Sequence, residues 1–144
     1  LVLMLDEKSK KLRRTIVQTV VSGGRGHIGP AGSLVELLRV IYDKWLRFDV
    51  DNPKWTGRDR FILSKGHGCL ALYSVLADKG FISHEELETF CRSDSILGGH
   101  PESSKIPLIL MCFSTSVTQI GTVLNFDANN KTCNLLLKTK STSR

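Results

Sequence analysis

The sequence predicts an α/β fold in which helices surround the start of a parallel sheet. The stretch from Arg58 to Gly68 is decisive, because a charged lead-in gives way to Phe61-Ile62-Leu63 and then to Ser-Lys-Gly-His-Gly. Three consecutive apolar residues bounded by turn-forming residues predict a short buried strand over 61–64, and a helix should begin at about Cys69. Loops at the carboxyl ends of strands in open α/β sheets bind ligands, so this loop is the first candidate site.

The loop after this strand has the chemistry of an anion site. Gly66 and Gly68 let the backbone approach a ligand closely, and Lys65 and His67 supply hydrogen-bond donors. The alternative is a plain strand-to-helix turn whose polar residues are solvated. The stretch by itself does not separate these two interpretations.

The residues before the strand predict two amphipathic helices. Within residues 6–22, apolar side chains recur at spacings of four, which indicates a helix with a basic outer face. The glycine-rich segment 22–30 should be a loop. Ser33 and Glu36 form a capping-box pattern, so the second helix should begin at Ser33 and run to about Trp45.

Further helices are expected after the loop. The helix that begins near Cys69 should close at Gly80 as its C′ residue. Ser83 should cap a short acidic helix that runs from Glu85 to about Cys91, with Glu86 in the capping-box position. Residues 93–107 are expected to be loop.

The composition changes after Pro107 to a stretch rich in Ser, Thr and Asn. We therefore divide the chain into a folded segment, 1–107, and a divergent tail, 108–144, that is irregular or weakly β-structured. Strands over Ile120–Phe126 and Cys133–Leu137 are the alternative to a poorly ordered tail.

Composition and charge narrow the class of protein. A chain of 144 residues suffices for one domain with a core. The net charge of +6 is spread without interleaved aromatic residues, so no nucleic-acid partner is expected. No apolar run approaches the ~18 residues of a membrane helix, so no membrane partner is expected either. The four cysteines form no CxxC pair and no zinc spacing, which is typical of reduced thiols in a cytoplasmic protein.

The glycine-rich segment also matches a dinucleotide fingerprint. Gly24-Arg25-Gly26-His27-Ile28-Gly29 fits G-x-G-x-x-G, and Asp49 stands near the position of a ribose-binding acid. The helical spacing before the motif and the late start of the next helix at Ser33 argue against it. The pattern alone leaves the matter open.

Three of the four histidines, His27, His67 and His100, lie beside glycine in predicted loops. A histidine so placed has little local cover, and its imidazole can donate to oxygen or carry a proton near neutral pH. A solvated loop histidine is the alternative for each one, but the repeated setting favours a shared site. His84 should lie on a helix surface. No HxxxH pair or neighbouring acid occurs, so no metal ligands are expected among the histidines.

Together the three loops resemble the amino-terminal, diphosphate-binding part of transketolases, in the style of bacterial enzymes whose halves are separate chains. The matching motifs are Gly26-His27-Ile28-Gly29, the run from Arg58 to Gly68, and Gly98-Gly99-His100-Pro101-Glu102 followed by Lys105-Ile106-Pro107. The resemblance runs from about residue 10 to Pro107. It favours the transketolase loop over a dinucleotide turn for the glycine-rich segment.

The resemblance implies a thiamine-diphosphate transferase of the pentose phosphate pathway that moves a two-carbon ketol unit from a ketose phosphate to an aldose phosphate. It implies catalytic roles for His27, His67 and His100, with His100 at the ketol end of the donor. It places His27, His67, Gly66 and Lys65 near the cofactor. The family's enzymes are homodimers that hold the diphosphate through Mg²⁺.

The sequence departs from the family after Pro107. The family's Gly-Asp-Gly motif, whose aspartate holds Mg²⁺, does not occur, and Asp127 lacks the flanking glycines. Such an abrupt loss of resemblance is what a change of reading frame or of splicing would produce. We therefore expect a truncated transketolase segment that binds its cofactor weakly or not at all. Activity should require a C-terminal transketolase subunit or domain, which supplies the family's activating glutamate.

Two alternatives stay open. A relative of 1-deoxyxylulose-5-phosphate synthase would share the early glycine–histidine loop, although the run from Arg58 to Gly68 fits transketolase better. A non-catalytic module that docks a transketolase C-terminal half is the other.

Overall fold

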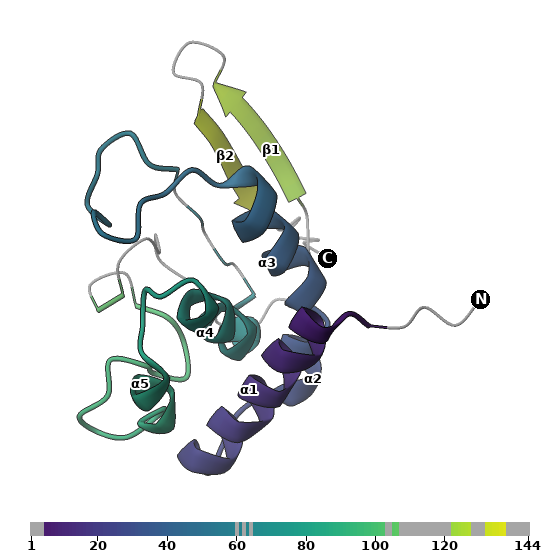
Figure 1. Cartoon of the computed structure of the whole chain (residues 1–144), viewed down its shortest axis with the longest axis vertical. Helices are drawn as coiled ribbons and strands as arrows, with labels where there is room; N and C mark the ends of the chain where they lie inside the picture. Colours follow the sequence, from purple (N-terminus) through teal and green to yellow (C-terminus); the bar gives the residue numbers. More distant parts are fainter. Residues whose placement is uncertain are drawn as a thin grey trace, which may run out of the picture.

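The computed structural model describes residues 5–59, 61, 63, 65–102 and 105–106, together with the backbone of 122–127 and 132–137. The described part of the chain before residue 107 is mainly helical (Figure 1). None of the helices in these ranges is both long enough and apolar enough to span a membrane. The helical elements are α1 (Glu7–Gly23), α2 (Ile28–Gly32), α3 (Val35–Val40), the π-helix η1 (Ile41–Trp45), the 3-10 helix η2 (Gly66–Gly68), α4 (Cys69–Asp78) and α5 (His84–Glu88).

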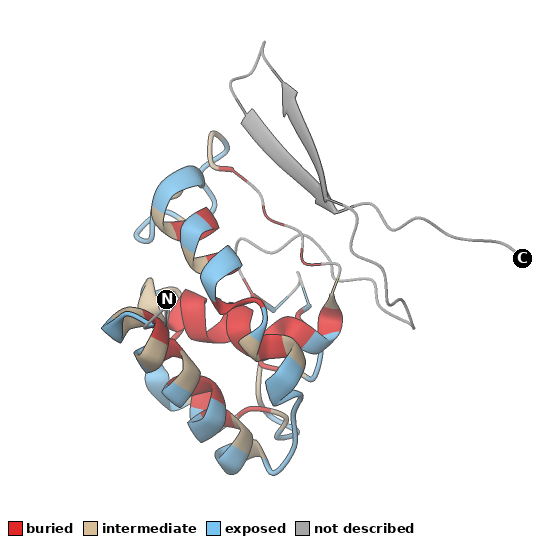
Figure 2. Cartoon of the chain, turned by 90° about the vertical axis from the view of Figure 1, so that its right-hand side faces the viewer, coloured by how far each residue is buried: buried red, intermediate tan, exposed pale blue. Residues whose placement is uncertain are grey.

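Helix α4 forms the centre of the fold. Every residue from Cys69 to Ala77 is buried, including Ser74, whose hydroxyl donates to the Leu70 carbonyl at 2.8 Å. Helices α1, α2, α3 and α5 all contact α4, and Figure 2 shows its buried ribbon among them. A helix that is apolar on all sides must be enclosed, so the sequence of α4 requires the other helices to surround it.

Helix α1 has the limits that its sequence predicts. The Asp6 side chain accepts a hydrogen bond from the Ser9 amide at 2.8 Å, which caps the first turn. Leu12 and Ile16 are buried in the core. The helix ends where Gly24 adopts a φ of +66°, a left-handed conformation that glycine adopts readily.

Two expectations about the next segment are wrong. The predicted loop 22–30 gives way to α2 at Ile28, because Pro30 lies in the first turn, where its missing N–H breaks no helical hydrogen bond. Ser33 does not cap the following helix, whose N-cap is Leu34. The Ser33 hydroxyl instead donates to the Pro30 carbonyl at 2.9 Å, and the Glu36 carboxylate pairs with Arg13.

The later caps follow the sequence, but α5 ends at Glu88, three residues before the predicted end at Cys91. Gly80, just beyond the C-cap of α4, has a φ of +85°. Ser83 and Glu86 form the predicted capping box, with both side-chain-to-backbone hydrogen bonds at 3.1 Å. His84 begins α5 and is exposed, as predicted.

The start of a parallel sheet is not confirmed. Phe61 forms an isolated β-bridge, and both Phe61 and Leu63 are buried, in agreement with a buried segment. Residues 62 and 64 lie outside the described residues.

The sheet that the described residues form is an antiparallel pair of strands, β1 (Thr122–Asp127) and β2 (Thr132–Leu137) (Figure 1). Its register places Thr122 opposite Leu137 and Asp127 opposite Thr132. These strands agree with the strand alternative for the tail. The rest of 108–144 lies outside the described residues, and the division at Pro107 stays a prediction.

Asp43 in η1 links three parts of the helical core. Its carboxylate pairs with Lys8 of α1 at 2.8 Å, with Arg39 of α3 at 3.5 Å, and with Lys79 after α4. Burial acts to raise the pKa of Asp43, but hydrogen bonds from Lys79 and Lys8 outweigh it and lower the pKa to about 2. The carboxylate therefore stabilises the packing of these helices while it is ionised.

Replacing Asp43 by Asn should lower the free energy of unfolding by about 2 kcal/mol at neutral pH. The folded-state pKa of about 2 lies below the ordinary 3.8. The contribution is therefore complete above about pH 5 and is lost as the pH falls through 4 toward 2. Urea unfolding of both proteins at several pH values measures it, with Asp94→Asn at an exposed loop position as the control. A difference that does not change with pH would contradict the prediction.

Candidate functional site

The fold brings the three predicted histidines together. The ring centroids of His27 and His67 lie 4.6 Å apart in an edge-to-face arrangement, and those of His67 and His100 lie 5.7 Å apart. All three residues are exposed. Three separate segments of the chain thus place imidazoles on one region of the surface, where they are accessible to a ligand.

His27 is held by the close passage of the chain between α1 and α4. Gly26 has a φ of +143°, and a Cβ at this position would lie 2.8 Å from Val20 Cγ2 and 2.9 Å from Leu70 Cδ1. Only glycine fits here. His27 follows as the N-cap of α2, and its carbonyl accepts from the Ala31 amide at 3.2 Å.

His67 occupies the middle of η2, directly before α4. The flanking Gly66 and Gly68 are buried while His67 is exposed. A Cβ on Gly68 would lie 2.2 Å from Leu34 Cδ1. The lack of a side chain at Gly68 therefore lets η2 lie directly against the start of α3, which fixes the direction in which the His67 backbone runs.

Lys65, a predicted cofactor-binding residue, contacts protein oxygens. Its Nζ lies 3.0 Å from Ser33 Oγ and 3.3 Å from the Pro30 carbonyl oxygen. The residue before η2 is thus joined to the C-terminal end of α2. This contact connects the segment that carries His67 to the one that begins with His27.

The His100 loop is attached to α4 by two donors that sequence reasoning missed. The Tyr73 hydroxyl donates to the Gly98 carbonyl at 2.8 Å, and Cys69 Sγ donates to the Gly99 carbonyl at 3.1 Å. The signal was present, because Cys69 and Tyr73 stand four residues apart in a mostly apolar helix and so share one face.

The loop that ends at His100 is also closed by its own backbone. The Cys91 amide donates to the Leu97 carbonyl at 2.8 Å, and Cys91 has a φ of +60°, which is uncommon for a residue other than glycine. The backbone hydrogen bond and the α4 contacts together fix both ends of the segment before His100.

Arg47 and Asp59 form a second arrangement that the sequence did not reveal. The Asp59 carboxylate accepts from the Arg47 amide at 2.7 Å and from its guanidinium at 3.2 Å, and the Asp59 amide donates back to the Arg47 carbonyl at 2.8 Å. The Asp59 side chain is only 2% exposed. The pair thus anchors the chain just before Phe61.

The dinucleotide alternative is wrong. The residues before the glycine motif form α1 and not a strand. Asp49, the expected ribose-binding acid, is exposed, and its carboxylate accepts from the Asp51 amide at 3.0 Å within a local turn.

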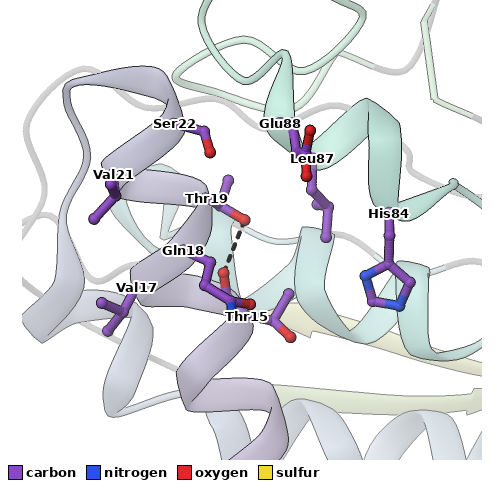
Figure 3. A pocket seen from close by; sticks show the side chains of 9 residues that line it. All are labelled: Thr15, Val17, Gln18, Thr19, Val21, Ser22, His84, Leu87 and Glu88. Carbon is purple, nitrogen blue, oxygen red and sulfur yellow. Dashed lines mark hydrogen bonds between the residues drawn. The ribbon is translucent and has the colours of Figure 1, made fainter.

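A surface pocket of about 420 Å³ lies apart from these histidines, between α1 and α5 (Figure 3). His84 contributes to it, but His27, His67 and His100 do not. In the part of the chain that the structure describes, no three His, Cys, Asp or Glu residues are grouped so that they could hold a metal ion. The pocket is lined by Thr15, Val17, Gln18, Thr19, Val21, Ser22, His84, Leu87 and Glu88.

A family model described as the thiamine diphosphate binding domain of transketolase matches residues 6–113. The chain belongs to the transketolase family. It is 44% identical over 97 residues to an apulose-4-phosphate transketolase subunit of Phocaeicola vulgatus, a match that covers 67% of this chain and 34% of that protein. A 6-deoxy-6-sulfo-D-fructose transketolase subunit of a Clostridium species is 38% identical over 96 residues, with 67% and 35% covered.

The fold of this chain is similar to a segment of solved transketolases. The crystal structure of the Pichia stipitis transketolase in complex with sedoheptulose-7-phosphate matches with a TM-score of 0.65 at 33% identity, covering 72% of this chain and 15% of that one. The transketolase resemblance seen in the sequence is thus confirmed. The chain is similar to the amino-terminal, diphosphate-binding segment of these proteins and spans about a third of the length of the two bacterial subunits.

Replacing Tyr73 by Phe should lower the free energy of unfolding by about 1 to 2 kcal/mol, because the Gly98 carbonyl loses its donor. The loop should also open more often, so the Cys91 amide should exchange faster with solvent. Urea unfolding and amide exchange by NMR measure the two effects.

Tyr42→Phe is the matched control for this experiment. The Tyr42 hydroxyl is buried, and within the described residues it has no hydrogen-bond partner. Its removal should therefore leave stability unchanged or raise it by about 1 kcal/mol. Equal losses in the two variants would contradict the assigned role of Tyr73.

Proposed function

We propose that this chain supplies the histidine-bearing part of a transketolase active site. The grouping of His27, His67 and His100 carries the proposal, since three exposed imidazoles in contact form a set of donors suited to carbonyl, hydroxyl and phosphate oxygens. Membership of a family whose domain binds thiamine diphosphate supports it. The proposed substrates are sugar phosphates.

The described residues fit a diphosphate-bearing cofactor in their donor chemistry. The His27 and His67 rings lie close enough to donate to oxygens of one anionic group. Gly66 offers backbone without a side chain beside them. When bound, thiamine diphosphate supplies the electron sink for breaking the carbon–carbon bond beside a ketone.

The three histidines divide the remaining work in this proposal. His27 and His67 accept and donate protons at the reacting oxygens, as general acid–base groups do. His100 donates a hydrogen bond to the ketol end of the donor sugar. Because His67 contacts both other rings, it couples the cofactor side of the site to the donor side.

The proposed activity needs residues from a longer assembly. The two bacterial relatives are each named as one subunit of a transketolase, which supports a partner that corresponds to a C-terminal transketolase subunit or domain. We further propose that Mg²⁺ binds through residues beyond those described, and that the segment 61–64 joins a parallel sheet completed by such residues. A homodimeric, cytoplasmic enzyme of the pentose phosphate pathway remains the expectation.

Isothermal titration of this chain alone with thiamine diphosphate and Mg²⁺ should give weak binding or none. The three histidines supply donors, but the described residues offer no acidic cluster to hold a metal ion. Micromolar binding by the isolated chain would contradict the proposal that the site is incomplete.

A chimera tests the role of the histidines. Residues 6–106 of this chain would replace the matching segment of the Phocaeicola vulgatus protein, and ketol transfer would be assayed with the partner of that protein. The chimera should be active, and His67→Ala within it should lower kcat/KM by about 100-fold or more. His84→Ala, on the exposed surface of α5, is the control and should leave the rate unchanged. An active chimera that tolerates His67→Ala would favour a non-catalytic docking module.

A further inference from the structure

We infer that Lys65 is a positioning residue that holds the His27 segment against the His67 segment. This role differs from direct binding of the cofactor diphosphate. Its catalytic importance rests on the proposed function of the two histidines, whereas the contacts that carry it are present in the chain itself.

The Lys65 ammonium contacts two oxygen atoms that are also hydrogen-bonded to each other. Its Nζ lies 3.0 Å from Ser33 Oγ and 3.3 Å from the Pro30 carbonyl oxygen. The Ser33 hydroxyl donates to the same Pro30 carbonyl at 2.9 Å. Ammonium, hydroxyl and carbonyl thus form a triangle at the C-terminal end of α2, the helix that His27 begins.

Helix α2 needs such support. It has five residues, and a helix so short is not stable by itself. Its backbone hydrogen bonds from Ala31 to His27 and from Ser33 to Gly29 are both 3.2 Å. A cation beside the C-terminal carbonyls of a helix is electrostatically favourable. The Lys65 ammonium therefore stabilises α2. It also stabilises the backbone of His27, because the His27 carbonyl accepts the first hydrogen bond of this helix.

The position of Lys65 in the chain makes this support specific. Lys65 is the N-cap of η2, and His67 follows two residues later. The contact therefore joins the starts of the two segments whose imidazoles lie 4.6 Å apart. Two of the three N–H groups of the ammonium face protein oxygens. Direct contact with an anion through the third is the competing role that the experiment must separate.

The experiment uses the whole 144-residue chain. Lys65→Met removes the donors, Lys65→Arg keeps the charge, and Ser33→Ala removes one acceptor. Lys54→Met, at an exposed turn, is the matched control. NMR measures the nuclear Overhauser effect between the His27 and His67 rings and the solvent exchange of the α2 amides. A parallel titration with inorganic pyrophosphate measures anion affinity.

The Lys65→Met variant should lose the contact between the histidine rings, and the Ala31 and Ser33 amides should exchange roughly tenfold faster. Ser33→Ala should show a smaller change in the same direction. Lys65→Arg should restore most of the ring contact, and Lys54→Met should match the wild type. If Lys65→Met fails to fold by circular dichroism, Ser33→Ala and Lys65→Arg decide between the outcomes.

Two results would overturn the inference. One is an unchanged ring contact and unchanged α2 exchange in Lys65→Met. The other is an unchanged ring contact with weakened pyrophosphate binding, which would make Lys65 an anion ligand. A chimera that binds no thiamine diphosphate would count against the proposed function alone, because the ring contact and the amide exchange of the chain do not depend on the cofactor.

Discussion

The enclosure of α4 sets the position of every loop that carries a candidate residue. Its residues are buried from Cys69 to Ala77, so the chain before and after it must pack against it on all sides. The first turns of α4 then become the meeting point of the three loops. His67 immediately precedes them, Leu70 packs beside Gly26, and Cys69 and Tyr73 bind the carbonyls of the His100 loop. The hydrophobic core and the candidate site are therefore built on the same residues.

Local signals in the sequence predicted those features whose cause is local. Ser83 forms a capping box with Glu86, three residues away, and Gly80 adopts the left-handed conformation that a helix end favours. The glycine-flanked histidines were found because their setting repeats. The same reasoning failed for α2 and Ser33, where glycine and proline content disfavours a helix and tertiary contacts override that preference.

The remaining features depend on residues far apart in the chain. No local pattern indicates that Lys65 contacts Ser33 or that Tyr73 holds Gly98. A parallel sheet was expected to begin at Phe61. One predicted strand does not define which strand pairs with it, and among the described residues Phe61 forms only an isolated β-bridge. Family membership could be predicted from the sequence, because it depends on the order and spacing of motifs along the chain and not on contacts between distant residues.

The fit between Gly68 and Leu34 has a consequence for how this protein can vary. The Leu34 side chain occupies the space that a Cβ at Gly68 would need. The two positions therefore share one volume, and the size allowed at one is set by the size present at the other. Substitution of Leu34 alters the packing surface of η2, which carries His67, although Leu34 belongs to a different segment. Natural or engineered changes in the chemistry of this surface are thus constrained by an aliphatic residue that itself carries no reactive group.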